Sequence, residues 1–132
     1  MRIAIELSGH LRSCVAIPTL LSKFRGHQID WYIHTYSNDL YPINQSISLP
    51  SNTNSNIEKV FNYIKPIGFE IEDNEEVLKE IKTLAKELKS KNNYDLGVNV
   101  ISCWRKRLKC SEMRRSFNKK YDLYIVTRPD LY

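Results

Sequence analysis

Hydrophobic and polar positions follow one another along this chain in blocks with two different periods. The first block, residues 2–8, is apolar in its interior apart from Glu6, which is typical of a short buried strand. Gly9 follows it and permits a sharp turn. The sequence therefore predicts a buried first strand that ends at a glycine turn.

Seven further blocks extend this pattern. Apolar residues at helical spacing predict helices over 15–24, 56–64, 74–91 and 98–118. Aromatic, β-branched or alternating residues predict strands over 29–36, 67–72 and 121–127. Two apolar faces are expected, one on the third strand and one on the last helix: Ile67, Phe69 and Ile71, then Ile101, Trp104 and Leu108.

Strands that alternate with helices imply a parallel sheet covered on both faces. We therefore predict an α/β fold with a mostly parallel sheet of about four strands. The length of 132 residues fits one domain that spans 1–132.

Composition narrows the class of protein. Hydrophobic residues make up 42% of the chain, which argues against global disorder. No apolar run approaches the roughly 20 residues that span a bilayer, so no transmembrane segment is expected. The three cysteines, Cys14, Cys103 and Cys110, favour a reducing, cytoplasmic compartment, and we expect them to be core or boundary residues rather than metal ligands.

The positive charge is concentrated near the C-terminal end. The chain carries a net charge of +5, while residues 101–120 alone carry +7. This stretch is either a solvated helix face or an anion site for nucleic acid or a nucleoside diphosphate. Charge alone favours the solvated face.

Polar residues with possible chemistry follow three of the predicted strands. They lie in 8–12, 34–39 and 127–130, and open α/β sheets bind ligands at the carboxyl ends of their strands. Amides near Gly9 suit a phosphate or a base, Arg12 suits a phosphate and Asp130 suits a divalent cation. His10 and His34 are candidate ligands or bases, although a lone histidine is more often a hydrogen-bonded structural residue. The glycine-rich dinucleotide and Walker motifs are absent.

Three ordered motifs give the sequence a resemblance to a known group. They are Ile3-Ala4-Ile5-Glu6-Leu7-Ser8-Gly9-His10-Leu11-Arg12, then Tyr32-Ile33-His34-Thr35, and finally Tyr121-Asp122-Leu123-Tyr124-Ile125-Val126-Thr127-Arg128-Pro129-Asp130-Leu131. In this order and spacing, the chain resembles the GT-A-type glycosyltransferase-like proteins of bacterial surface-polysaccharide clusters and large viruses.

The resemblance implies a site for a nucleoside-diphosphate sugar of the UDP or GDP type, and hexosyl transfer from it. Its implied nucleotide-binding residues are Ser8, Gly9, His10, Arg12, His34, Trp104, Arg105 and Arg128. Asp130 takes the place of the last metal-binding aspartate of such proteins, which implies Mn²⁺ or Mg²⁺ beside the diphosphate. No catalytic residue is identified.

Two departures from the family pattern limit what is expected. Val126 stands where the pattern has its first arginine, and the chain is shorter than such enzymes. We therefore expect the N-terminal, donor-binding half only, with acceptor, donor sugar and stereochemistry undetermined. Two other functions remain open: a structural protein that forms a homo-oligomer through an exposed sheet edge, and, ranked last, a basic nucleic-acid-binding module.

Overall fold

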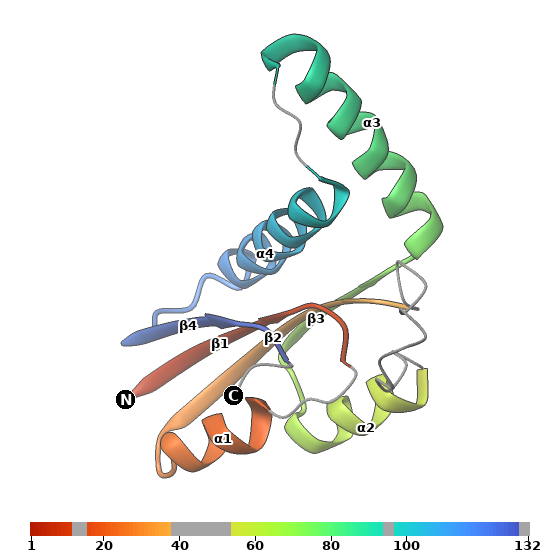
Figure 1. The fold of residues 1–132 in the computed structure, drawn as a ribbon. Coiled ribbons are helices and arrows are strands. Elements are labelled where there is room, and N and C mark those ends of the chain that lie inside the picture. The colour runs from red at the N-terminus through yellow and green to blue at the C-terminus, as the bar shows by residue number, and fades with distance from the viewer. Residues whose placement is uncertain (12–15, 38–53, 94–96, 130–132) are drawn as a thin grey trace.

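Four strands form one parallel sheet in the computed structural model, which describes residues 1–11, 16–37, 54–93 and 97–129. The strands are β1 (Arg2–Ser8), β2 (Gln28–Tyr36), β3 (Gly68–Glu72) and β4 (Leu123–Thr127). They lie in the order β3-β2-β1-β4 and every pair is parallel (Figure 1). The two strands with the longest apolar runs, β1 and β2, are therefore at the centre.

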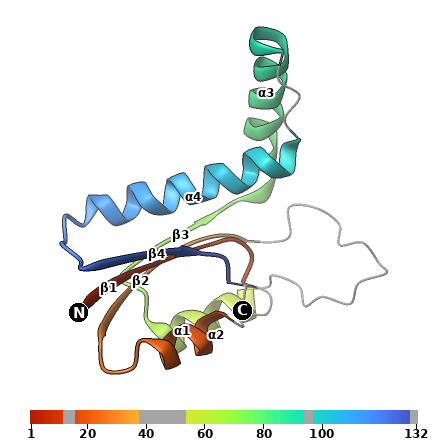
Figure 2. The same cartoon turned by 60° about the vertical axis from the view of Figure 1, so that its left-hand side comes forward.

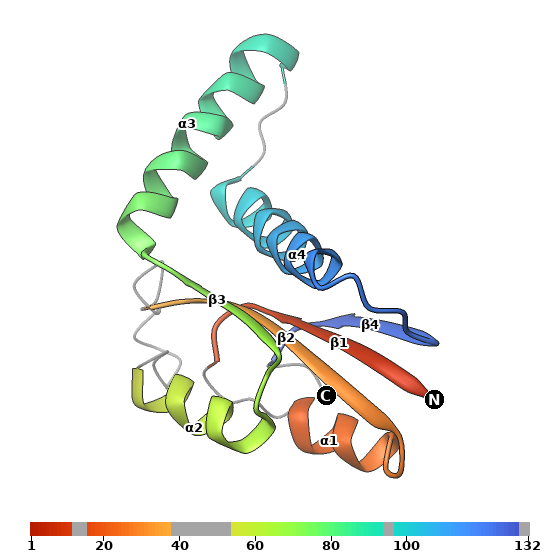
Figure 3. The ribbon, with the colours of Figure 1, turned by 180° about the vertical axis from the view of Figure 1, so that it is seen from behind.

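The helices lie on both faces of this sheet. Their bounds are α1 (Ala16–Lys23), α2 (Asn54–Ile64), α3 (Asn74–Asn92) and α4 (Val98–Ser116). Figures 1 and 3 show α1 and α2 together on one face and α4 on the other. Figure 2 shows that α3 leaves the end of β3 and projects away from the sheet.

Local signals explain where the two long helices begin and end. Asp73 caps α3, because its carboxylate accepts hydrogen bonds from the amides of Glu75 and Glu76. Helix α4 ends at Ser116, two residues before the predicted end, because Asn118 adopts a left-handed conformation with φ of 51°. The chain then returns to start β4 beside β1.

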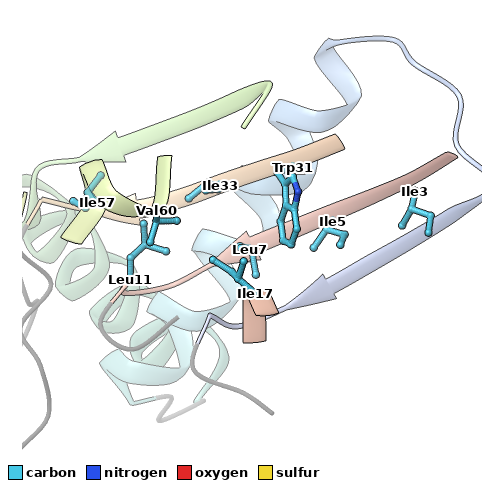
Figure 4. Close-up of a cluster of buried hydrophobic side chains, with 9 residues drawn as sticks. All are labelled: Ile3, Ile5, Leu7, Leu11, Ile17, Trp31, Ile33, Ile57 and Val60. Atoms are coloured by element: carbon cyan, nitrogen blue, oxygen red, sulfur yellow. The ribbon is translucent and has the colours of Figure 1, made fainter. Parts of the chain in front are cut away.

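The apolar core lies between the sheet and the α1–α2 layer. Figure 4 shows side chains from β1 and β2 meeting those from the two helices. The buried members are Ile3, Ile5, Leu7, Leu11, Ile17, Trp31, Ile33, Ile57 and Val60. Because side chains alternate across a strand, the other residues of β1 and β2 face α4, and several of those are polar.

The face under α4 combines a small apolar patch with buried polar groups. Cys110 of α4 packs with Ala4 and Tyr32, and burial raises the pKa of its thiol to about 12. Cys103 is half-buried. The prediction of core or boundary cysteines is therefore confirmed for these two, while Cys14 lies outside the described residues.

Two of the predicted apolar faces do not point into the core. Phe69 and Ile71 share one side of β3, as predicted, but are 56% and 42% exposed. Ile101, Trp104 and Leu108 of α4 line one groove, in keeping with the predicted apolar face, but Trp104 and Leu108 are 65% and 54% exposed. The reason is that α4 turns its polar side chains, rather than these two, toward the charged face of the sheet.

The predicted fold class is confirmed: the chain is a Rossmann-like α/β fold with a four-stranded parallel sheet and helices on both faces. Among the described residues, no helix has both the length and the apolar character needed to cross a membrane.

A substitution at Gly68 tests how closely the sheet packs against the residues that follow α4. A Cβ at this position would lie 2.8 Å from Phe117 Cε2 and 2.9 Å from Tyr32 Cδ1. Gly68→Ala should therefore lower the free energy of unfolding by about 1–3 kcal/mol, measured by urea denaturation. The control Gly97→Ala, where no heavy atom lies within 4 Å, should cost less than about 1 kcal/mol. Equal losses of unfolding free energy in the two variants would show that the close contact at Gly68 does not contribute to stability.

Candidate functional site

The parallel sheet brings the predicted site residues to one edge. Ser8 pairs in register with His34, and Leu7 pairs with Thr127. The residues that follow β1, β2 and β4 therefore lie side by side, as expected for the described members Ser8, Gly9, His10, His34 and Arg128. Arg12 and Asp130 lie outside the described residues.

The turn at Gly9 is packed against the turn after β4. Its φ is 142°, a conformation that favours glycine, and its amide donates to the carbonyl of His34 at 3.0 Å. A Cβ at Gly9 would lie 3.4 Å from Pro129 Cδ and 3.9 Å from Lys106 Nζ. The amide of Ala16, at the start of α1, donates to the carbonyl of Pro129 at 3.1 Å. Elements β1, β4, α1 and α4 thus meet at this turn.

This meeting point is the topological switch of the sheet. From β1 the chain moves outward through β2 to β3, and β4 lies on the opposite side of β1. In open α/β sheets, the crevice beside such a switch is where ligands bind. Lys106 adds a cation there that the resemblance did not single out. The clue in the sequence was its place in the basic stretch 101–120.

A second group of polar residues lies along the ends of β2 and β3. His34 Nε2 is hydrogen-bonded to Glu72 Oε1. Arg105 donates to Glu72 Oε1 at 2.7 Å and to Oε2 at 2.8 Å, and its Nη2 also donates to Glu80 Oε2 at 2.8 Å. This network joins α4 to β2, β3 and α3. Arg105, implied by the resemblance as a nucleotide-binding residue, is therefore held by carboxylates.

The network fixes the charges of its members. Burial by itself raises the pKa of Glu72, but hydrogen bonds from Arg105 and His34 outweigh it and hold the pKa at about 2. The hydrogen bond to Glu72 raises the pKa of Arg105. Burial lowers the pKa of His34, against the opposing influence of Glu72. Near neutral pH, His34 is therefore neutral between a carboxylate and the sheet.

The tautomer of His34 follows from this arrangement. Ionised Glu72 only accepts hydrogen bonds, so His34 carries its proton on Nε2. His34 is completely buried, and Nδ1 has no hydrogen-bond partner in the part of the chain that the structure describes. The same holds for Oγ of Ser8, its register partner, which is 1% exposed. Two buried polar atoms therefore lie on adjacent strands without a partner in the described part of the chain.

Two aromatic contacts hold the histidines in place. The ring of Tyr36 meets that of His34 edge-on, with 5.5 Å between centroids, and meets that of His10 at 5.6 Å. Tyr36 lies in the segment 34–39 that the sequence predicted at the sheet edge, although no role was assigned to it. It follows His34 by two positions on β2, and therefore lies on the same face.

One group of described residues could hold a metal ion. Ligand atoms of His34, Glu70 and Glu72 all lie within 4.8 Å of one another. The sequence interpretation missed Glu70 and Glu72. Their signal was the Glu-Ile-Glu ending of the predicted strand, which puts two carboxylates on one side of it.

Trp104 lies away from the Gly9 turn. It lines an apolar groove of about 660 Å³ between α3 and α4, with Leu84, Val100 and Leu108. The guanidinium of Arg107 lies 5.4 Å from the centre of its ring system. This groove and the Gly9 turn are separate features of α4.

The basic stretch of 101–120 is partly neutralised inside the molecule. Glu6, 1% exposed, accepts hydrogen bonds from Arg114 and from Ser111, the latter at 2.5 Å. Lys119 lies 3.7 Å from the carboxylate of Asp30. The sequence predicted that this basic stretch is either a solvated helix face or an anion site. Together with the pair formed by Arg105, these contacts show that part of its charge serves neither purpose. It neutralises acidic residues on the sheet.

Comparisons with protein-family models, curated proteins and solved structures find no match to this chain.

The ion pair of Glu72 gives a pH-dependent prediction. Glu72→Gln should lower the free energy of unfolding by about 2–3 kcal/mol at pH 7, because it breaks a largely buried pair. The pKa of Glu72 falls from 4.5 to about 2 on folding. Its stabilisation is therefore complete above about pH 5 and disappears as the pH falls toward 2.

Denaturation of both proteins between pH 2 and 8 measures this difference. The control Glu87→Gln changes an exposed carboxylate on α3 and should have an effect below about 0.5 kcal/mol. A deficit for Glu72→Gln that is constant with pH would contradict the assignment.

Proposed function

We propose that this chain binds a nucleoside diphosphate, carried as its sugar ester, at the switch point beside Gly9, as the donor-binding domain of a glycosyltransferase. The observation that carries the proposal is the meeting of a side-chain-free turn and a cation at the carboxyl edge of the sheet. A Cβ at Gly9 would lie 3.9 Å from Lys106 Nζ. Glycine allows a diphosphate to approach the backbone closely, and the ammonium provides the opposite charge.

The neighbouring residues support a nucleotide rather than a simple anion. Arg128 directly follows β4 on the same edge. The half-buried ring of His10 lies beside the turn, tilted against the buried ring of Tyr36. Resemblance in the three motifs adds independent support for a UDP- or GDP-sugar.

A divalent cation, Mn²⁺ or Mg²⁺, belongs to this proposal. When bound, it would neutralise charge that develops on a diphosphate leaving group. The resemblance implies Asp130 as its ligand, which lies outside the described residues. His34, Glu70 and Glu72 are the described residues able to bind a cation, but Arg105 already contacts both oxygens of Glu72.

Nucleic-acid binding is less well supported. Arg105, Arg114 and Lys119 each pair with a carboxylate, which reduces the charge available for a phosphate backbone.

Calorimetric titration of the full chain with UDP, GDP and their sugar esters, with and without Mn²⁺, tests the main proposal. Lys106→Gln should weaken binding by about tenfold to a hundredfold, because it removes a charge-assisted contact. The matched control Lys120→Gln removes the same charge from an exposed position in the loop after α4 and should leave the affinity within about twofold. Equal weakening by both variants, or no binding of any nucleotide, would refute the proposal.

Self-association is a second candidate, favoured by the apolar groove between α3 and α4. Trp104, Leu108 and Val100 are each more than two-fifths exposed there, and exposed apolar patches mark interfaces. Leu108→Glu should shift a dimer toward monomer by at least about tenfold in dissociation constant, measured by sedimentation velocity. Exposed Val126→Glu on β4 is the control. A wild-type chain that is monomeric at all concentrations rules this candidate out.

A further inference from the structure

The cluster at the ends of β2 and β3 has the composition of a transition-metal site. His34 and Glu70 are register partners on adjacent strands, and Glu72 follows on the same face of β3. Their ligand atoms lie within 4.8 Å of one another. One imidazole nitrogen and two carboxylate oxygens suit Zn²⁺ and related ions better than Ca²⁺ or Mg²⁺, which prefer oxygen alone.

The His34 side chain is held in one orientation by its neighbours. Its Nε2 is hydrogen-bonded to Glu72 Oε1. His34 is also fixed on a central strand against Tyr36, and a rigid support of this kind preorganises a ligand.

The local charge favours a further cation. Glu70, Glu72 and Glu80 supply three carboxylates around the cluster, while Arg105 supplies one positive charge. Glu70, partly buried, makes no hydrogen bond or ion pair with another residue that the structure describes. The cluster therefore keeps a net negative charge after its internal pairing, which attracts a cation.

Two buried atoms beside the cluster point to an additional ligand. Nδ1 of the fully buried His34 and Oγ of neighbouring Ser8 have no partner among the described residues. Buried polar groups are normally satisfied. Ser8 lies on β1 and the two glutamates lie on β3, with His34 between them on β2. These two atoms therefore mark a further polar position next to the cluster.

We propose that His34, Glu70 and Glu72 form a Zn²⁺-class metal site in which Arg105 is an internal competing cation. Arg105 contacts both oxygens of Glu72, so the metal and the guanidinium compete for the same carboxylate. When the metal binds Glu72, Arg105 keeps its contact with Glu80. Three protein ligands leave the fourth position of zinc to water or a substrate group. The site does not depend on nucleotide binding at Gly9.

Titration of the chelator-treated full chain with ZnCl₂ alone tests the site. We expect one Zn²⁺ per chain, much weaker binding of Mg²⁺ and Ca²⁺, and a shift of the His34 ring nitrogen resonances on binding. Glu70→Gln should weaken Zn²⁺ binding at least tenfold while the chain stays folded, because Glu70 takes no part in the Arg105 network. Glu75→Gln, an exposed carboxylate in the first turn of α3, is the matched control and should leave binding unchanged.

Arg105→Gln distinguishes a metal site from a structural ion pair. Removal of the competing cation should tighten Zn²⁺ binding by about tenfold, although the metal-free chain becomes less stable. If the metal-free variant is unfolded, Zn²⁺ should restore its circular dichroism spectrum, and Arg105→Gln combined with Glu70→Gln should lose this rescue. The proposal fails if Zn²⁺ binds Glu70→Gln as tightly as wild type, or if loss of Arg105 neither tightens binding nor permits rescue.

Discussion

The ion pair between Glu72 and Arg105 lies beside a small apolar cluster that joins the sheet to α3 and α4, formed by Tyr36, Val77, Ile81 and Ile101. Helices α1 and α2 rest on a continuous hydrophobic core, and burial of that surface is enough to hold them in place. Helix α4 covers the other face of the sheet, where Glu6, Asp30 and His34 are buried. Arg105 contacts Glu72 at the end of β3 and Glu80 on α3. It thereby ties α3 and α4 to the sheet.

Buried ion pairs of this kind specify an arrangement more than they stabilise it. The cost of removing two charges from water offsets much of their attraction, whereas loss of one partner leaves the other charge buried and unpaired. Two pairs act at different points on α4: Arg105 reaches Glu72, and Arg114 reaches Glu6. Any rotation of α4 about its axis would break both at once. The pairs, together with the buried Ile101 and Cys110, therefore determine which side of the helix faces inward. Trp104 and Leu108 are left facing outward.

The sequence predicts what depends on local pattern. Each strand was located to within two residues, because apolar runs and breaks such as Gly9 are local signals. The sequence also predicted that Ser8 and His34 lie close together, because parallel strands end at a common edge. The orientation of α4 did not follow, because hydrophobic periodicity shows only that Ile101, Trp104 and Leu108 share one face. The orientation depends on Glu72 and Glu6, which pair with Arg105 and Arg114 of α4. Each glutamate lies 33 or more residues away in the sequence from the arginine that it contacts.

The two candidate sites on the sheet edge are positioned by different elements. The Gly9 turn is positioned by β1, β4 and the amide of Ala16, elements anchored to the apolar core. The cluster of His34, Glu70 and Glu72 depends on β2, β3 and on Arg105 from α4. Lys106 and Arg105 are adjacent on α4, and they lie at these two different candidate sites. A change in the position of α4 would alter both, so occupancy of one site can affect the other through this helix. Such coupling requires that each ligand bind two positions of α4 with different affinity. At the proposed metal site, competition between metal and guanidinium for Glu72 would supply that difference for the metal.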